Sequence, residues 1–162
     1  MRLYLVQHGE ALPADVDPAR PLSTAGWQDV QSMADLLEAA GIRVARVWHS
    51  GKTRAEQTAA LLARRVCPRC RIEAVGGIGP NDPIAEFIQD LDVWQEDTLI
   101  VGHLPFMARL VAQLVCGDPE RALVSYFPGS VVCLERSGTL SWSIQWMLRP
   151  DAFAPHRHAG EP

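Results

Sequence analysis

The sequence predicts an α/β fold of three layers, α/β/α, with a mostly parallel central sheet and an antiparallel hairpin at its C-terminal end. Short apolar runs alternate with segments of helical periodicity as far as residue 116. This alternation is typical of parallel strands joined by right-handed crossover helices, which cover both faces of the sheet. Beyond it, two strand-like runs at 130–135 and 140–148 flank Ser137-Gly138. A short Gly-containing connection of this kind predicts the hairpin.

The first half of the chain is expected to contain three strands with a helix after each of the first two. The strand-like apolar runs are 3–6, 44–49 and 72–75. A loop at 10–23 with three prolines follows the first run. Ser23 or Thr24 can cap the next helix, and Gly41 is placed to end it. Helical spacing of apolar side chains predicts the second helix over 53–65.

The second half begins with a glycine-rich connection, 76–83, and a helix expected over 84–91. The segment 98–103 has the clearest pattern of a buried strand. Pro105 suits the first turn of the following helix, and Gly117 is placed to close that helix. Alternating apolar side chains in the final strand predict one buried face, formed by Trp142, Ile144, Trp146 and Leu148.

Length and composition predict one globular domain. The 162 residues fit a single core, which we assign to 1–150, and the polar segment 151–162 is expected to be a mobile tail. The apolar fraction of 48% and the charged fraction of 21% are ordinary for a globular protein. The formal net charge of −4 provides no general basic surface, so neither nucleic acid nor an anionic membrane is an expected partner.

No segment predicts a membrane span or an exported protein. The apolar start at 3–6 is too short for a signal-peptide core, and no run approaches the roughly 20 apolar residues of a spanning helix. The four cysteines, Cys67, Cys70, Cys116 and Cys133, are therefore expected to be reduced thiols in a cytoplasmic protein. Cys67 and Cys70 have the spacing of a redox pair but lack a second pair of zinc ligands, so neither chemistry is favoured there.

Three strand ends carry the residues that suggest a function. In a parallel sheet, the loops after the first, second and fourth strands share one edge, where α/β proteins bind ligands. These loops deliver His8, then Lys52 and Arg54, then His103. Imidazole can act as a nucleophile or a proton carrier, and guanidinium binds phosphate oxygens in pairs. The sequence therefore predicts phosphoryl chemistry at this edge.

Other interpretations of these residues are open or weaker. Arg54 could be a solvated helix residue, and either histidine could be a structural residue at a strand end. A P-loop is not formed, because Arg46 occupies the position that needs glycine before Gly51-Lys52-Thr53. No nucleophile elbow of the form G-x-S-x-G is present, and the two histidines lack an evident carboxylate as third metal ligand.

Four motifs together resemble the histidine phosphatase, or phosphoglycerate mutase-like, superfamily. They are Gln7-His8-Gly9-Glu10-Ala11, Arg20-Pro21-Leu22-Ser23, the segment from Ser50 to Thr58 that contains Arg54-Ala55-Glu56-Gln57-Thr58, and Val101-Gly102-His103-Leu104-Pro105. The order and spacing are most similar to the short SixA-type phosphohistidine phosphatases, over residues 1–148. Each motif alone is weak, but four in register are specific.

The resemblance implies a mechanism without a metal or organic cofactor. His8 would attack phosphorus and form a phosphohistidine intermediate, which water then hydrolyses. Arg54 and His103 would bind the phosphoryl oxygens and stabilise the developing charge, and Arg20 would support the pocket from the first loop. The branch has no clear leaving-group acid, and Asp82 is the one carboxylate we nominate for that role.

The chain departs from the superfamily at Gln7, where the signature has arginine. Glutamine can donate hydrogen bonds and so contact phosphate, but it carries no charge. We therefore expect a phosphatase of reduced activity. The expected substrate is phosphohistidine in a partner protein, with inorganic phosphate as the product. The alternatives are a small phosphate ester as substrate, or a phosphate-binding or phosphoprotein-binding module without catalysis.

Overall fold

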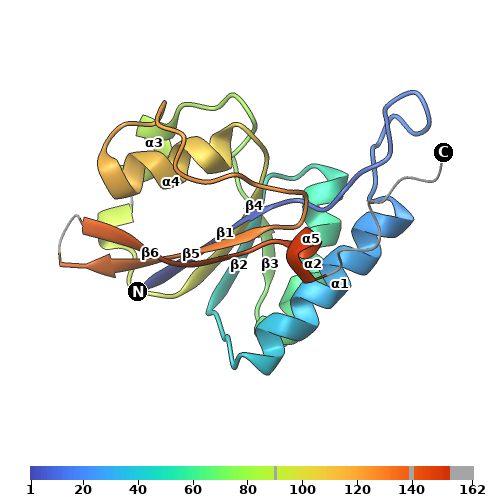
Figure 1. Cartoon of the computed structure of the whole chain (residues 1–162), viewed down its shortest axis with the longest axis horizontal. Helices are drawn as coiled ribbons and strands as arrows, with labels where there is room; N and C mark the ends of the chain where they lie inside the picture. Colours follow the sequence, from blue (N-terminus) through green and yellow to red (C-terminus); the bar gives the residue numbers. More distant parts are fainter. Residues whose placement is uncertain (90, 139–140, 154–162) are drawn as a thin grey trace.

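The computed structural model describes residues 1–89, 91–138 and 141–153, and six strands of this part form one sheet (Figure 1). The strands are β1 (Arg2–Gln7), β2 (Arg46–His49), β3 (Ile72–Ala74), β4 (Thr98–Gly102), β5 (Val131–Ser137) and β6 (Ser141–Leu148). Their order across the sheet is β3-β2-β4-β1-β5-β6. The first four are parallel, and β5 and β6 form an antiparallel hairpin beside β1. The predicted architecture is confirmed.

Helices cover both faces of this sheet. They are α1 (Thr24–Ala39), α2 (Thr53–Val66), α3 (Ile84–Ile88), α4 (Phe106–Cys116) and α5 (Pro150–Phe153), with a 3₁₀ helix, η1 (Leu91–Val93), after α3. Figure 1 shows α1 and α2 on one side of the sheet and α3 and α4 on the other. Alternate side chains of β1 enter the two apolar clusters: Tyr4 and Val6 pack on the α1 side, and Leu3 and Leu5 pack on the α4 side.

Helix boundaries follow from local capping. Ser23 Oγ accepts a hydrogen bond from the Gly26 amide at 3.0 Å and caps α1, as predicted. The predicted helix over 84–91 is shorter in the structure, because α3 ends early and the chain tightens into η1. The N-cap of α3, Pro83, makes no side-chain capping bond, which leaves this short helix with little local stabilisation.

A β-bulge in the terminal hairpin changes which faces its tryptophans occupy. The register between β5 and β6 shifts at Cys133, which makes Gln145 an extra residue in β6. Side chains therefore change faces at this point. Trp142 packs with the cluster on the α4 side, whereas Trp146 packs on the α1 side, with its ring 5.9 Å from that of Tyr4. The prediction of a single tryptophan face is wrong, because simple alternation assumes an unbroken ladder.

The cysteine prediction is wrong for one pair. The chain turns directly after α2, and the turn brings the Cα atoms of Cys67 and Cys70 to 5.5 Å, where the two residues form a disulfide. Cys116 and Cys133 are free thiols. A cytoplasmic location stays a prediction.

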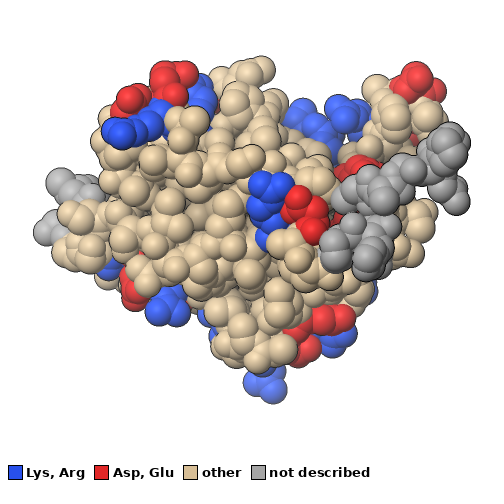
Figure 2. All heavy atoms as spheres, in the orientation of Figure 1, with Lys and Arg blue, Asp and Glu red and all other residues tan. Residues whose placement is uncertain are grey.

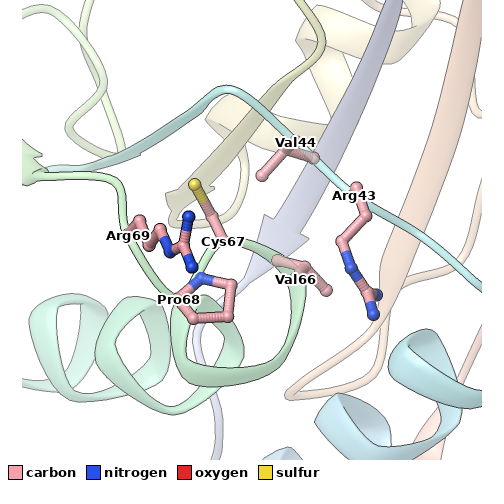
Figure 3. A pocket seen from close by; sticks show the side chains of 6 residues that line it. All are labelled: Arg43, Val44, Val66, Cys67, Pro68 and Arg69. Carbon is pink, nitrogen blue, oxygen red and sulfur yellow. The ribbon is translucent and has the colours of Figure 1, made fainter.

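A hollow of about 220 Å³ lies beside Cys67 (Figure 3). It is lined by Arg43, Val44, Val66, Cys67, Pro68 and Arg69. The hollow lies at the C-terminal end of α2, whereas Arg54 lies in the first turn of that helix. A helix of this length spans about 20 Å at 1.5 Å per residue. The hollow is therefore remote from the strand ends that carry the predicted site.

The described part of the chain continues past residue 150, the predicted domain end. Helix α5 contacts α1 and includes the first residues of the predicted tail. The rest of that tail, 154–162, and residue 140 of the predicted final strand lie outside the described residues. Among the helices that the structure describes, none is long and apolar enough to cross a membrane. Basic and acidic side chains form small mixed groups on the face shown in Figure 2.

Candidate active site

The carboxyl ends of β1, β2 and β4 meet at one edge of the sheet and place the predicted residues around one cavity. Gln7 is in register with Gly102, and the parallel pairing of β2 with β4 brings the loop after His49 to the same edge. The cavity has a volume of about 280 Å³. It is lined by Gln7, His8, Arg20, Arg54, Pro80, His103 and Leu104. All five predicted phosphate-binding residues therefore lie at one site.

His8 presents an unprotonated ring nitrogen to Arg54. Its Nδ1 lies 2.7 Å from the carbonyl oxygen of Gly9. Because a carbonyl only accepts, Nδ1 carries the proton and Nε2 carries the lone pair. That lone pair accepts a hydrogen bond from Nε of Arg54 at 3.1 Å. Nε2 is therefore the atom of this ring that can act as a nucleophile.

The surroundings of His8 keep its ring neutral. Burial lowers its pKa to about 4, the nearby charges of Arg54 and Arg20 also lower it, and the hydrogen bond to the Gly9 carbonyl raises it. At neutral pH the ring therefore lacks the second proton that would block nucleophilic attack.

The pKa of His8 is expected to rise when Arg20 is replaced by glutamine, because one of the cations that disfavour the imidazolium is removed. The wild-type ring should stay neutral until the pH falls close to about 4, and the Arg20→Gln ring should gain its proton at a higher pH. An NMR titration of the His8 ring measures both values, with Arg43→Gln, a change remote from the site, as control. Identical titrations for wild type and Arg20→Gln would contradict this electrostatic effect.

Helix α2 is joined directly to the loop that carries His8. The hydroxyl of Thr58 accepts a hydrogen bond from the Gly9 amide at 3.0 Å and donates one to the Arg54 carbonyl at 2.7 Å. Thr58 is fully buried, so water does not compete for these bonds. The backbone that carries the histidine and the helix turn that carries the arginine are therefore held together by one side chain.

Two glycines allow this loop to pack against α1. A Cβ atom at Gly9 would lie 2.7 Å from Cγ2 of Val30. A Cβ atom at Gly26, in the first turn of α1, would overlap the backbone carbonyl of Glu10. Neither position accepts a side chain without movement of the chain, so the approach of the loop to α1 depends on glycine at both.

Arg20 reaches the cavity from a constrained loop. Its φ of 50° lies in the left-handed region that non-glycine residues rarely adopt. An isolated bridge between Ala11 and Leu22 closes the loop around it, and the Leu22 amide donates to Oε1 of Gln57 on α2 at 2.7 Å. Strained backbone of this kind persists where the surrounding bonds fix it, and it clusters at functional sites.

The ring of His103 lies beside that of His8, with 4.9 Å between the ring centroids, and both line the cavity. Burial lowers the pKa of His103 to about 3, and the charges of His8, Arg54, Lys52 and Arg20 act in the same direction. Its Nε2 lies 2.6 Å from the hydroxyl of Ser50. Among the described residues, its Nδ1 and Oε1 of Gln7 are the buried side-chain polar atoms without a hydrogen-bond partner.

The structure does not bring Asp82 to this cavity. Its carboxylate accepts a hydrogen bond from the Gly79 amide at 2.7 Å and so stabilises the loop that carries Pro80. No carboxylate is among the residues found to line the cavity in the described part of the chain. In the same part of the chain, no group of three His, Cys, Asp or Glu side chains is arranged to hold a metal ion.

Sequence reasoning missed several residues of the site. Ser50 and Thr58 belong to the motif that identified Arg54, but a hydroxyl near a helix start has several possible partners. Pro80 and Leu104 line the cavity as apolar residues and carry no chemical signal in the sequence. The position of Ser50 directly after a strand, at the same edge as His8, is the one pattern that could have indicated it.

Comparison with known proteins agrees with the fold. No family model matches the chain. The phosphohistidine phosphatase SixA of Escherichia coli is 28% identical over 150 residues, which cover 89% of this chain and 93% of that protein. A structure of the protein histidine phosphatase SixA with tungstate has a TM-score of 0.83 and 23% identity, over 94% of this chain and 99% of the other. The α-ribazole phosphatase of Shigella flexneri has a TM-score of 0.77 and 18% identity, over 93% and 97%.

The chain therefore has the phosphoglycerate mutase-like fold, and the predicted resemblance to the histidine phosphatase superfamily is confirmed. The proteins that the chain resembles include SixA, which is named a phosphohistidine phosphatase and so a hydrolase acting on phosphoryl groups. The roles of the individual site residues stay predictions.

Proposed function

We propose that this chain is a metal-independent phosphatase that uses His8 as its nucleophile and hydrolyses phosphohistidine in a partner protein. The observation that carries the proposal is the state of His8: a neutral ring, protonated on Nδ1, whose Nε2 lone pair lies beside Arg54 and opposite His103. The similarity to SixA, which is named a phosphohistidine phosphatase and whose structure is described with tungstate, a tetrahedral oxyanion, supports it.

The chemistry has two displacement steps. A bound phosphoryl oxygen takes the Arg54 N–H that is now donated to His8, and this frees Nε2 to attack phosphorus. The bond from phosphorus to the leaving group breaks, and the leaving group keeps the electron pair. Water then attacks the phosphohistidine, His8 leaves with the electron pair of the broken bond, and inorganic phosphate is released. Arg54, Arg20 and His103 stabilise charge on the phosphoryl oxygens in both steps.

The lining of the cavity favours a leaving group that needs little help from an acid. No carboxylate lines the described cavity, so an alkoxide leaving group would depart without a nearby proton donor. The imidazole of phosphohistidine is a better leaving group than an alkoxide. Leu104 is 37% exposed and, with Pro80, forms an apolar part of the rim against which such a ring can pack.

A small phosphate ester is the second candidate substrate. With either substrate, phosphohistidine or a small ester, we expect Gln7 to reduce the activity. The similarity to α-ribazole phosphatase, named for a small phosphate substrate, favours this candidate. A third candidate, a phosphate-binding module without turnover, follows from the uncharged Gln7 alone.

A substrate panel tests these candidates. A phosphohistidine-carrying protein should be hydrolysed about 10²-fold or more faster, by kcat/KM, than a sugar phosphate, because a general acid typically contributes 10²–10⁴-fold to the departure of a poor leaving group. p-Nitrophenyl phosphate, whose leaving group needs no acid, serves as the control for a competent site. Equal rates on phosphohistidine and sugar phosphate would favour the small ester, and phosphate binding without any turnover would favour the binding module.

A further inference from the structure

We propose that Ser50 is a positioning residue that keeps the proton of His103 on Nδ1, so that His103 offers an N–H donor to the phosphoryl oxygens; this rests on the proposed function. Ser50 Oγ lies 2.6 Å from Nε2 of His103. A hydroxyl can donate or accept in such a bond, and its choice decides which ring nitrogen holds the proton.

Ser50 does not cap helix α2. It lies close to the start of α2, and a serine at the N-cap position commonly caps a helix. The N-cap is instead Lys52, which makes no side-chain capping bond. Gly51, with a φ of 80°, turns the chain after Ser50, and its amide donates to Nδ1 of His49 at 3.1 Å. The hydroxyl is thereby directed across the edge of the sheet to His103.

The other side of the His103 ring requires a donor. Its Nδ1 is buried without a partner, and the other such atom among the described residues is Oε1 of Gln7, a carbonyl oxygen at the neighbouring strand end. Both residues line the cavity, and the phosphoryl oxygens of a substrate there are also acceptors. A lone pair on Nδ1 would repel a phosphoryl oxygen that approached it, whereas an N–H on Nδ1 can donate to that oxygen.

Which nitrogen of His103 carries the proton matters only if the ring is neutral, because an imidazolium carries a proton on both nitrogens. His103 is 2% exposed, and His8, Arg54, Lys52 and Arg20 place positive or polar groups around it. The ring therefore holds one proton, and the donor in the bond between Ser50 and Nε2 must be the serine hydroxyl. Ser50 thus sets the hydrogen-bonding character of the ring without a contact to substrate of its own.

The test combines a spectroscopic readout with kinetics. ¹⁵N–¹H NMR of the His103 ring, assigned by comparison with His103→Gln, should show the proton on Nδ1 in the wild-type protein without any ligand. In Ser50→Ala the proton should redistribute toward Nε2, and kcat/KM should fall about 10–100-fold, the usual effect of removing a group that orients a histidine. Ser50→Thr, which keeps the hydroxyl, should restore both. Ser32→Ala, on the exposed side of α1, is the matched control.

Three results would overturn the proposal: a wild-type ring protonated on Nε2, a tautomer unchanged in Ser50→Ala, or a threonine variant that behaves as the alanine variant does. The tautomer readout needs no substrate and gives an answer even if Ser50→Ala does not fold, because the wild-type spectrum alone can contradict the assignment. Failure of the proposed function would be seen separately, as the absence of turnover by the wild-type protein in the substrate panel.

Discussion

Replacement of His8 by alanine is expected to remove the covalent phosphoenzyme and to lower kcat/KM by about 10⁴-fold or more, since loss of a catalytic nucleophile has effects of that size. The reason is specific to this ring. Nε2 of His8 carries a lone pair and lies beside Arg54 in the cavity. In the alanine variant, Arg20 and Arg54 can still bind a phosphoryl group but cannot accept it covalently.

Labelled phosphate trapped on the protein under alkaline denaturing conditions, where phosphohistidine survives, measures the intermediate. His8→Asn is the matched control, because its side-chain amide can still donate to the Gly9 carbonyl and so preserves the local hydrogen bond. Label retained by both variants would assign the nucleophile elsewhere. The next candidate would be His103, whose ring lies 4.9 Å away.

Replacement of Gln7 by arginine is expected to raise kcat/KM by about 10²–10³-fold, the usual value of one donor to a developing oxyanion. Gln7 lines the cavity but contributes no charge, and its Oε1 is a buried acceptor without a partner. A guanidinium in its place would supply several N–H donors and a positive charge. The added cation would also disfavour the imidazolium of His8.

Two further variants separate charge from geometry at this position. Gln7→Lys adds the charge without the planar pair of donors, and Gln7→Met keeps the approximate length without either. The expected order of kcat/KM is arginine, then lysine, then glutamine, then methionine, measured on one phosphorylated substrate. If Gln7→Arg folds normally and gains nothing, the glutamine does not limit the chemistry, and the expectation of a weakened phosphatase is wrong.

Much of the architecture could be predicted because apolar runs and glycines mark the strand ends. His8 and His103 each follow such a run, and parallel pairing makes their meeting a geometric necessity once the strand order brings β1 beside β4. The cavity therefore follows from a few local signals combined with one topological rule.

The remaining features depend on contacts that sequence patterns do not contain. The bulge at Gln145 is a property of the pairing of two strands, and the alternation of β6 alone gives no sign of it. Asp82 looked available to the site, but its carboxylate binds the amide of Gly79 in its own loop. The hydroxyl of Ser50 could have capped a helix, and only the three-dimensional neighbourhood shows that it binds His103.

The absence of side chains at Gly9 and Gly26 limits how this protein can change. Any larger residue at Gly26 would displace the carbonyl of Glu10, two positions from His8, so the start of α1 and the loop that carries His8 form one unit. New substrate contacts are expected farther out, at positions other than Arg20 in the loop between Ala11 and Leu22. Changes in selectivity are therefore expected in that loop, while the contact between Gly26 and the Glu10 carbonyl leaves no room for a side chain.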